Sequence, residues 1–406
     1  MPLQDSAAAP KGWITRTVLG IVLATLFSDF SHEMVTAVLP YYLLTLGLGP
    51  SALGMIEGVA DLLVSLAKLG GGVAGHRLPR KKPLVALGYL VTAAATSAMA
   101  LARGLGSLVL LRTVAWTGRG FRSPLRDFLL ADEVERTHYG RAYGLERAGD
   151  MAGAVAGPLV AALLVWAGLA YGTIMLWAFV PGVLAVGSVL LLVRERRDGA
   201  AVVAAGAPKP SIPRAFWLLL AGVFLFGIGD FSRTFLILIA ARSLDGGPAP
   251  ASGVLSIPVL LYAAHNLVSA LAAYPIGRWA DRWSKPRVLL CGYALGVATN
   301  ALLAFRGGET AWVIAAIGMS GLYIAVEEVA EKATAAQFLP RELRSLGLGI
   351  LACANALGDM ASSLTVGFLL QRGSPLLAFG IPAAVGALGV GWLLIVLKRI
   401  ETRPAR

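Results

Sequence analysis

Apolar residues in this chain come in long continuous runs rather than in alternation with polar residues. Runs of about 20 residues recur along the whole length, and an α-helix of that length crosses the apolar core of a bilayer. We therefore expect an all-α integral membrane protein with twelve transmembrane helices. The predicted spans are 14–44, 52–76, 83–102, 107–132, 141–167, 171–193, 215–241, 252–277, 286–305, 310–337, 345–370 and 376–397.

The twelve runs form two sets of six, and short motifs of the first set return in the second about two hundred residues later. The matching pairs are Asp29-Phe30-Ser31-His32 with Asp230-Phe231-Ser232-Arg233, Gly72-x3-His76-Arg77 with Gly277-x3-Asp281-Arg282, and Gly88-Tyr89 with Gly292-Tyr293. The offsets are 201, 205 and 204 residues. We expect two similar six-helix bundles, residues 1–197 and 214–406, joined by the Ala/Pro/Gly-rich linker 198–213. The interface between them is the first place to look for a site.

Composition agrees with a membrane environment. The chain is 57% hydrophobic and 14% charged, whereas a soluble domain carries roughly a quarter charged residues. Its mean hydropathy is +0.73. The first run is too long for a signal-peptide core and lacks an evident cleavage site, so we expect it to remain as a span. Cys291 and Cys353 both lie within predicted spans, which argues against a disulfide framework or a metal-thiolate cluster.

Basic residues gather in alternate loops. They are Arg77, Arg80, Lys81 and Lys82 after the second span, Arg194, Arg196, Arg197, Lys209 and Arg214 in the linker, Arg278, Arg282, Lys285 and Arg287 after the eighth span, and Lys398, Arg399, Arg403 and Arg406 in the tail. The opposite loops hold only the scattered Arg103, Arg242, Arg306 and Arg372. The positive-inside rule then predicts cytoplasmic termini and linker, in a multi-pass protein of the plasma (inner) membrane. Because the net charge of +12 sits in these short loops, we expect no nucleic-acid partner.

The repeated loop after the second helix of each half resembles the signature of the major facilitator superfamily (MFS). Its positions are Gly72, His76, Arg77 and Arg80 in the first half, and Gly277, Asp281, Arg282 and Lys285 in the second. The family usually has Asp where His76 stands and Gly where Pro79 stands. The resemblance implies two pseudo-symmetric six-helix bundles, with these loops clamping neighbouring helices on the cytoplasmic side. His76 is either a partly exposed loop histidine or a pH-sensitive part of the clamp, since imidazole titrates near neutrality.

A second resemblance lies on the fifth span, where small residues recur around a proline. Gly144, Gly153, Gly157 and Pro158 match the family's antiporter motif, with alanines in place of its last two glycines. This implies exchange of the substrate for protons, as in exporters. The alternative is ordinary close packing of small residues between helices.

The fourth span is similar to the superfamily's Arg-x5-Gly-x-Gly helix, at Arg112, Gly118 and Gly120. With the downstream Gly140-Arg141-Ala-Tyr-Gly144, it resembles a branch of prokaryotic efflux permeases that includes nickel-resistance exporters. Because Arg112, Arg119 and Arg126 are seven residues apart, they lie on one helical face, with Arg122 close by.

Ionisable groups within spans are costly in lipid and are therefore functional candidates. The proton-coupling candidates are Asp29, Glu33, Asp61 and Asp230. The substrate-cavity candidates are His32, Glu57, Arg112, Arg119, Arg233, His265, Asn266 and Glu327. Counting along the antiparallel first and fourth spans predicts that Asp29 or Asp61 pairs with Arg119 near mid-membrane and that Glu33 lies nearer Arg112. Glu146, Arg147 and Asp150 of the fifth span are expected toward the cytoplasmic side.

The second half differs, because its tenth span is acidic where the fourth span is basic. It carries Glu327, Glu328 and Glu331 beside Lys332. The cavity is thus predicted to be basic on one wall and acidic on the other. The alternative is that all these groups pair among themselves and only fix helix packing.

These features predict a secondary transporter that works by alternating access, in which the halves rock about a mid-membrane site. We expect proton-coupled antiport, that is, efflux, of a small molecule, by a monomer with no cofactor and no resident metal. Burial and a neighbouring arginine act in opposite directions on a carboxylate's proton affinity, which offers a coupling mechanism. Two alternatives stay open: proton-coupled transport of an organic anion held by Arg112 and Arg119, and nickel or cobalt export. Four histidines in all argue against dedicated metal export.

Two other classes are weaker. Gly318-Met319-Ser320-Gly321 matches the Gly-x-Ser-Gly of intramembrane serine proteases, and His265 lies on another span. Such short tetrads of small residues are common in this chain, so we expect no enzyme. A channel or a transport-dead receptor on the same scaffold is the other alternative.

Overall fold

The structure is a computed structural model that describes residues 12–48, 50–195, 211–231, 235, 239 and 257–401, apart from some side chains within helices. Its described elements are helical. They are α1 (Arg16–Thr45), α2 (Pro50–Arg77), α3 (Lys82–Ala98), η1 (Met99–Leu101), α4 (Leu105–Glu133), η2 (Arg136–His138), α5 (Tyr139–Trp166), α6 (Tyr171–Trp177), α7 (Phe179–Leu192), α8 (Arg214–Gly227), α10 (Ile257–Arg282), α11 (Lys285–Arg306), α12 (Thr310–Phe338), α13 (Arg341–Gln371) and α14 (Pro375–Glu401).

Each of the twelve predicted runs contains at least one of these helices, so the all-α prediction is confirmed. The sixth run holds α6 and α7, which together form a single apolar stretch of 22 residues. The seventh begins with α8, and most of its second part lies outside the described residues. By length and composition alone, eight helical segments of the described part are apolar enough to cross a membrane. The long helix α4 is not among them, because its arginines and acids lower its hydropathy.

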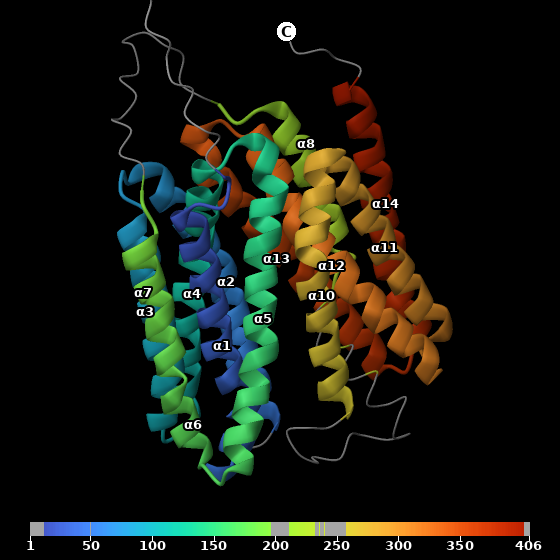
Figure 1. The fold of residues 1–406 in the computed structure, drawn as a ribbon. Coiled ribbons are helices and arrows are strands. Elements are labelled where there is room, and N and C mark those ends of the chain that lie inside the picture. The colour runs from blue at the N-terminus through green and yellow to red at the C-terminus, as the bar shows by residue number, and fades with distance from the viewer. Residues whose placement is uncertain are drawn as a thin grey trace, which may run out of the picture.

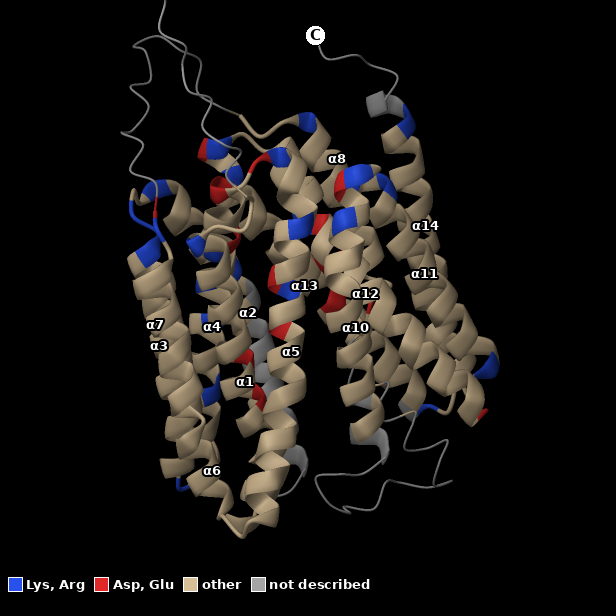
Figure 2. Ribbon diagram, in the orientation of Figure 1, with Lys and Arg blue, Asp and Glu red and all other residues tan. Residues whose placement is uncertain are grey.

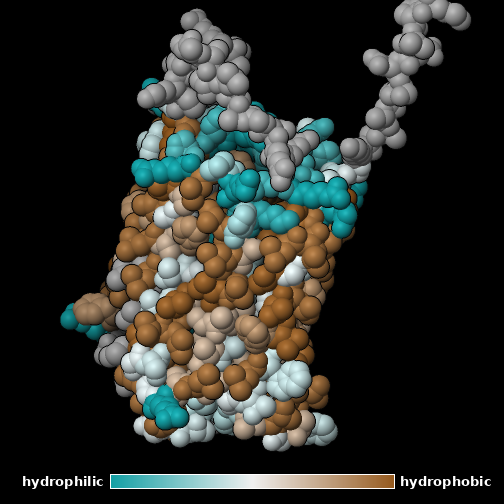
Figure 3. Space-filling model, turned by 90° about the vertical axis from the view of Figure 1, so that its left-hand side faces the viewer, coloured by the Kyte–Doolittle hydropathy of each residue, from teal (hydrophilic) through white to brown (hydrophobic). Residues whose placement is uncertain are grey.

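The helices form two bundles that stand side by side, α1 to α7 in one and α8 to α14 in the other (Figure 1). Each bundle holds two clusters of buried apolar side chains around its own helices, with the largest cluster also reaching across to α10 and α12. Helix α1 begins and α14 ends at the same end of the molecule. Lysines and arginines are concentrated there, and we call it the basic end (Figure 2). Below it, apolar side chains cover the visible surface as a broad belt (Figure 3).

Close helix packing within the first bundle depends on glycine. Helices α1 and α5 approach so closely that a Cβ on Gly153 would overlap the backbone of Leu26, and one on Gly157 would lie 2.7 Å from the carbonyl oxygen of Phe30. This packing fixes α1 against the helix that carries the antiporter-like motif. Pro158 follows within the same helix.

Candidate functional site

The two bundles meet through glycines near the basic end. On α5 and α10, a Cβ on Gly140 would overlap the carbonyl oxygen of Gly277, and Gly144 faces the backbone of Ala273. On α2 and α13, a Cβ on Gly72 would lie 2.9 Å from the Cα atom of Gly349. The predicted gating-loop glycines therefore lie at the contact between the halves. Gly144, assigned to the antiporter-like motif, packs against the other bundle, unlike Gly153 and Gly157.

Asp281 of the second gating loop joins the two halves. Its side chain is fully buried, and its two oxygens accept hydrogen bonds from the backbone N–H groups of Gly140 and Arg141, each at 2.8 Å. The Nε atom of Arg141 and the Nζ atom of Lys285 lie 3.2 Å from the same carboxylate. A carboxylate at the N-terminus of a helix satisfies N–H groups that have no partner inside that helix. Asp281 thus caps α5 from the opposite bundle, while Arg282 is exposed.

His76 stands at the equivalent position of the first gating loop. Its Nδ1 atom lies 3.0 Å from the carbonyl oxygen of Glu342, in the first turn of α13. Arg77 and Arg80 are exposed. The next residue, Lys81, is half-buried, and desolvation lowers the pKa of its ammonium. The loop therefore touches α13 without giving it a carboxylate.

A second ion pair crosses between the halves beside this loop. Arg341, the first residue of α13, binds Asp132 at the end of α4 with Nε–Oδ1 and Nη2–Oδ2 distances of 2.5 and 2.8 Å. The arginine side chain is 43% exposed, so water weakens the pair. Sequence reasoning did not predict it.

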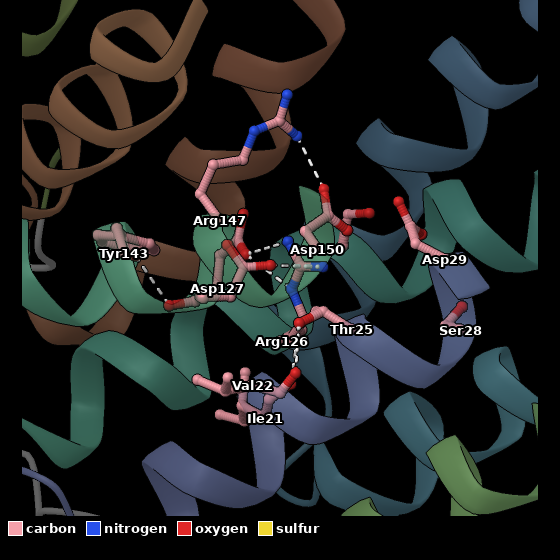
Figure 4. Close-up of polar contacts among 12 residues, drawn as sticks. Ile21, Val22, Thr25, Ser28, Asp29, Arg126, Asp127, Tyr143, Arg147 and Asp150 are labelled. Atoms are coloured by element: carbon pink, nitrogen blue, oxygen red, sulfur yellow. Dashed lines mark hydrogen bonds and ion pairs between the residues drawn. The ribbon is translucent and has the colours of Figure 1, made fainter. Parts of the chain in front are cut away.

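Below the gating loops lies a layer of ion pairs on α4 and α5 (Figure 4). Arg126 binds its neighbour Asp127 at 2.8 Å and Glu146 at 3.0 Å. Arg147 binds Asp150 at 2.8 Å. Most of these side chains are buried, and each has an opposite charge beside it. The structure thus places these charged groups of the fourth and fifth spans near the basic end and largely neutralises them.

This layer also reaches the second half through α12. Glu328 lies 3.9 Å from Arg147, and Lys332 lies 3.9 Å from Asp127, with Lys332 and Glu328 paired at 3.0 Å. Two residues of the acidic tenth span therefore face the first bundle rather than their own.

Asp29 of α1 and Arg119 of α4 form an ion pair inside the first half. Arg119 donates two hydrogen bonds to the Asp29 carboxylate, at 2.5 Å from Nη1 to Oδ1 and 3.0 Å from Nη2 to Oδ2. The Asp29 side chain is 4% exposed and that of Arg119 is 23% exposed. The pair joins the middle of α1 to the middle of α4, and it is one of the two pairings that counting along the spans predicted.

Toward the other end of α1 and α4, polar side chains surround Trp116. The His32 ring lies edge-on at 5.0 Å, and the Arg112 and Arg119 guanidinium carbons lie 5.2 and 5.6 Å from the Trp116 ring centre. His32 is 5% exposed, and neither its Nδ1 atom nor Nε1 of Trp116 has a hydrogen-bond partner among the described residues. Thr36 contacts both His32 and Arg112, at 3.4 and 3.5 Å. This group therefore brings the Trp116 indole N–H and two guanidinium groups close together.

Glu33 is the next proton-coupling candidate along α1. It is half-buried and makes no hydrogen bond or ion pair within the described part of the structure. Its Cβ faces Gly157 of α5, so it lies on the α5 side of α1. The contact from α1 to Arg112 in the described residues comes instead from Thr36, one helical turn further along.

Arg122 lies inside the first bundle rather than at its surface. It is 2% exposed, donates a hydrogen bond to the Oγ atom of Ser28 at 2.8 Å, and stacks over the Tyr89 ring at 3.8 Å. Its Nε and Nη1 atoms have no hydrogen-bond partner in the described part of the structure. The ring partly replaces a counter-ion, since a guanidinium over an aromatic face is attracted to it.

Acids and tyrosines meet in the second half where α8 ends. Asp230 accepts a hydrogen bond from the Tyr323 hydroxyl at 2.6 Å, and Tyr293 donates one to Glu331 at 3.0 Å. Glu327 lies on the α12 face shared by Tyr323 and Glu331, at 4% exposure. No ion pair to Glu327 occurs among the described residues. Arg119 binds Asp29 in the first half, whereas tyrosine hydroxyls donate to Asp230 and Glu331 in the second.

His265 and Ser320 are brought together as the protease alternative requires. The Nε2 atom of His265 lies 3.1 Å from Oγ of Ser320, and its Nδ1 atom lies 3.2 Å from Oδ1 of Asn266. All three residues are at most 3% exposed. The contact joins α10 to α12 within the second bundle, and such burial suits a packing role better than access for a substrate.

Some predicted residues cannot be located. The side chains of Glu57 and Asp61 on α2, and the whole of Arg233, lie outside the described residues. Their roles stay predictions. In the part of the chain that is described, no group of three or more His, Cys, Asp or Glu side chains is arranged to hold a metal ion.

Comparison with known proteins agrees with this architecture. The family model described as Major Facilitator Superfamily matches residues 21–264 and 259–406. An uncharacterized MFS-type transporter of Methanocaldococcus jannaschii is 23% identical over 386 residues, which is 95% of each chain.

Two solved structures share the fold. The human organic anion transporter MFSD10 aligns with a TM-score of 0.70 at 14% identity, covering 93% of this chain and 99% of that one. The proton:xylose symporter XylE aligns with a TM-score of 0.70 at 12% identity, covering 93% and 94%. The twelve-helix, two-bundle architecture and the match to the family model together indicate a multi-pass membrane transporter of small molecules rather than an enzyme. The chain belongs to the major facilitator superfamily.

Proposed function

We propose that the protein is a proton-coupled antiporter that exports a small molecule by alternating access, with the Asp29–Arg119 pair as its coupling element. The observation that carries the proposal is this buried two-hydrogen-bond pair between α1 and α4. A carboxylate held by an arginine stays charged, and it takes up a proton more readily when the arginine is drawn away. A substrate that competes with Asp29 for Arg119, or with Arg119 for Asp29, therefore changes the proton occupancy of Asp29.

The basic end is proposed to face the cytoplasm of a bacterial or archaeal cell, because basic loops are retained on that side. The residues 198–213 are then a cytoplasmic linker between bundles 1–197 and 214–406. With the halves in contact at this end, the structure corresponds to a state closed toward the cytoplasm. Export then requires the contacts of Gly140, Asp281 and Arg341 to open, so that the site is loaded from inside.

Two further observations favour antiport. Gly153 and Gly157 of the antiporter-like motif pack directly on the α1 segment that carries Asp29 and Glu33. The fifth span is therefore in contact with the helix that holds the proton-coupling candidates. Glu33, half-buried and without an ion pair in the described residues, is the second carboxylate that we assign to proton transfer.

The test has two stages, because the substrate is not known. A thermal-shift screen of the purified protein against lipophilic cations, organic anions and divalent metals, at about pH 5.5 and 7.5, identifies a ligand. Everted membrane vesicles are then energised, and the proton gradient is followed with a pH-sensitive dye while that ligand is added. We expect the ligand to discharge the gradient in the unmodified protein and not in Asp29→Asn or Glu33→Gln.

Glu309→Gln is the matched control, since it removes a carboxylate that is 57% exposed at the opposite end and should leave the signal unchanged. Full coupling in both amide variants would show that neither acid carries the proton.

The indole N–H of Trp116, with two arginines beside it, favours a second candidate, proton-coupled transport of an organic anion. A carboxylate substrate would supply the acceptor that the Trp116 N–H lacks among the described residues, and two arginines lie beside it. The human organic anion transporter has the same fold. Stabilisation by anions that disappears in Arg119→Gln would establish this candidate. An anion bound to Arg119 would release Asp29, which could then take up a proton together with the substrate. The mechanism would then be symport rather than antiport.

A further inference from the structure

The end of α10 and the start of α11 carry an exposed group of arginines and tryptophans that the transport proposal does not use. It consists of Arg278, Trp279, Arg282, Trp283 and Arg287, here called the Arg–Trp patch. The two indole rings stack on each other at 5.5 Å with an angle of 13° between their planes. The guanidinium of Arg287, from the first turn of α11, lies 5.9 Å from the Trp283 ring centre. The rings are 45% and 51% exposed.

The positive charge of the patch is not neutralised by the acid nearest in sequence. Asp281 is the single acidic residue between positions 278 and 287, and its fully buried carboxylate is bound by Arg141, Lys285 and two backbone N–H groups. No ion pair to Arg278 or Arg282 occurs in the described part of the structure. Arg278 and Arg282 therefore present positive charge where α10 leaves the apolar belt.

Comparison with the first half shows that the gating loop does not require this patch. At the offset of 205 residues, Val73, Ala74 and Leu78 stand where Arg278, Trp279 and Trp283 stand. Both loops still bring a glycine against the opposite bundle. The two tryptophans and Arg278 are thus additions of the second half, and fold alone does not account for them.

We propose that the Arg–Trp patch binds the headgroup of an anionic phospholipid, independently of which substrate is transported. Arginine donates paired hydrogen bonds to phosphate oxygens, and its charge is retained at any physiological pH. Tryptophan is favoured at the membrane interface, where the ring lies among the headgroups and the first carbons of the acyl chains. A phosphodiester attached to acyl chains satisfies both requirements together, which a soluble phosphate does not.

Native mass spectrometry of the delipidated protein tests the assignment, with phosphatidylglycerol and phosphatidylcholine added separately. We expect retained adducts of phosphatidylglycerol and far fewer of phosphatidylcholine. In Arg278→Gln/Arg282→Gln/Arg287→Gln, affinity for phosphatidylglycerol should fall on the order of 100-fold, about fivefold for each arginine near the surface. All three side chains are exposed, so we expect the variant to fold, which its melting temperature checks.

Arg77→Gln/Arg80→Gln/Lys82→Gln is the matched control, because it removes three charges from the corresponding loop of the first half. An equal loss of affinity for phosphatidylglycerol in this control would overturn the proposal. It would mean that the lipid is attracted by the overall positive charge of the basic end and not by the Arg–Trp patch. Trp279→Leu/Trp283→Leu keeps every charge and should still weaken binding severalfold. Unchanged binding in that variant, or displacement of the lipid by equimolar glycerol phosphate, would likewise contradict a lipid site.

Discussion

The two gating loops occupy equivalent places in the two halves, yet they hold the opposite bundle by different chemistry. In the second half, the buried Asp281 carboxylate caps α5 and binds two cations. In the first half, His76 makes one contact to a carbonyl oxygen of α13, whose N-terminus has no side-chain cap. The first-half contact depends instead on the partly exposed pair of Arg341 and Asp132.

This difference teaches that the repeat conserves shape more than charge. Glycine at positions 72 and 277 lets the backbones meet in both halves, whereas the polar contacts around them differ. We therefore expect the α5–α10 contact to dominate the stability of the closed basic end and the α2–α13 contact to be the weaker of the two. Each variant below is measured by the separation of the halves, using spin labels at the exposed positions Arg136 and Lys398 after both cysteines are replaced by serine.

Asp281→Ala should have the largest effect. It removes a buried carboxylate and leaves Arg141, Lys285 and two N–H groups without their acceptor. Breaking a buried ion pair on one side typically costs about 3–5 kcal/mol. We expect the short-distance population, which is the closed state, to be largely lost. Glu309→Ala, at an exposed pair on the other end, is the control that should change nothing. An unaltered distance distribution in Asp281→Ala would show that the Asp281 cap does not keep the basic end closed.

Gly277→Ala should follow, with a cost of about 1–3 kcal/mol for the closed state. The added Cβ would overlap the backbone carbonyl of Gly140, and neither backbone can move without displacing its helix. Gly72→Ala is the informative partner, because its Cβ would approach the Cα atom of Gly349 at 2.9 Å, a milder overlap. We expect Gly277→Ala to lengthen the distance between the labels more than Gly72→Ala. The reverse order would contradict the ranking of the two contacts.

Most of the fold could be predicted from the sequence, because the signals for it are local. Each apolar run reports its own helix, and the basic loops and the repeat report how the helices are grouped. The pairing of Asp29 with Arg119 was also within reach. It needed only the depth of each residue in two antiparallel helices and the electrostatic cost of leaving either charge alone in lipid.

The contacts between the bundles could not be predicted in the same way. The docking of the two halves brings Asp132 to Arg341 and Asp127 to Lys332. Neither the local sequence pattern nor the depth of a residue in its helix predicts how the halves dock. Trp116 was missed for a related reason, since a tryptophan within an apolar run looks like core. Its role as the centre around which His32 and Arg112 gather appears only when α1 and α4 are side by side.

His76→Asp should have the smallest effect and the opposite sign. An aspartate here would restore the residue that the second half has at position 281. It would face the first turn of α13, where N–H groups lack a side-chain acceptor. A new cap and its interaction with the helix dipole contribute about 1 kcal/mol, so we expect a roughly fivefold gain in the closed population. His76→Ala, which adds no acceptor, should not show this gain.

The double variant His76→Asp/Asp281→Ala tests whether the loop of the first half alone can keep the basic end closed. Partial recovery of the short distance would mean that the two loops are interchangeable clamps and that the first is weak only because it lacks a carboxylate. If the double variant stays as open as Asp281→Ala, the backbone of the first loop is not positioned to cap α13. The asymmetry would then lie in the geometry of the halves rather than in one side chain.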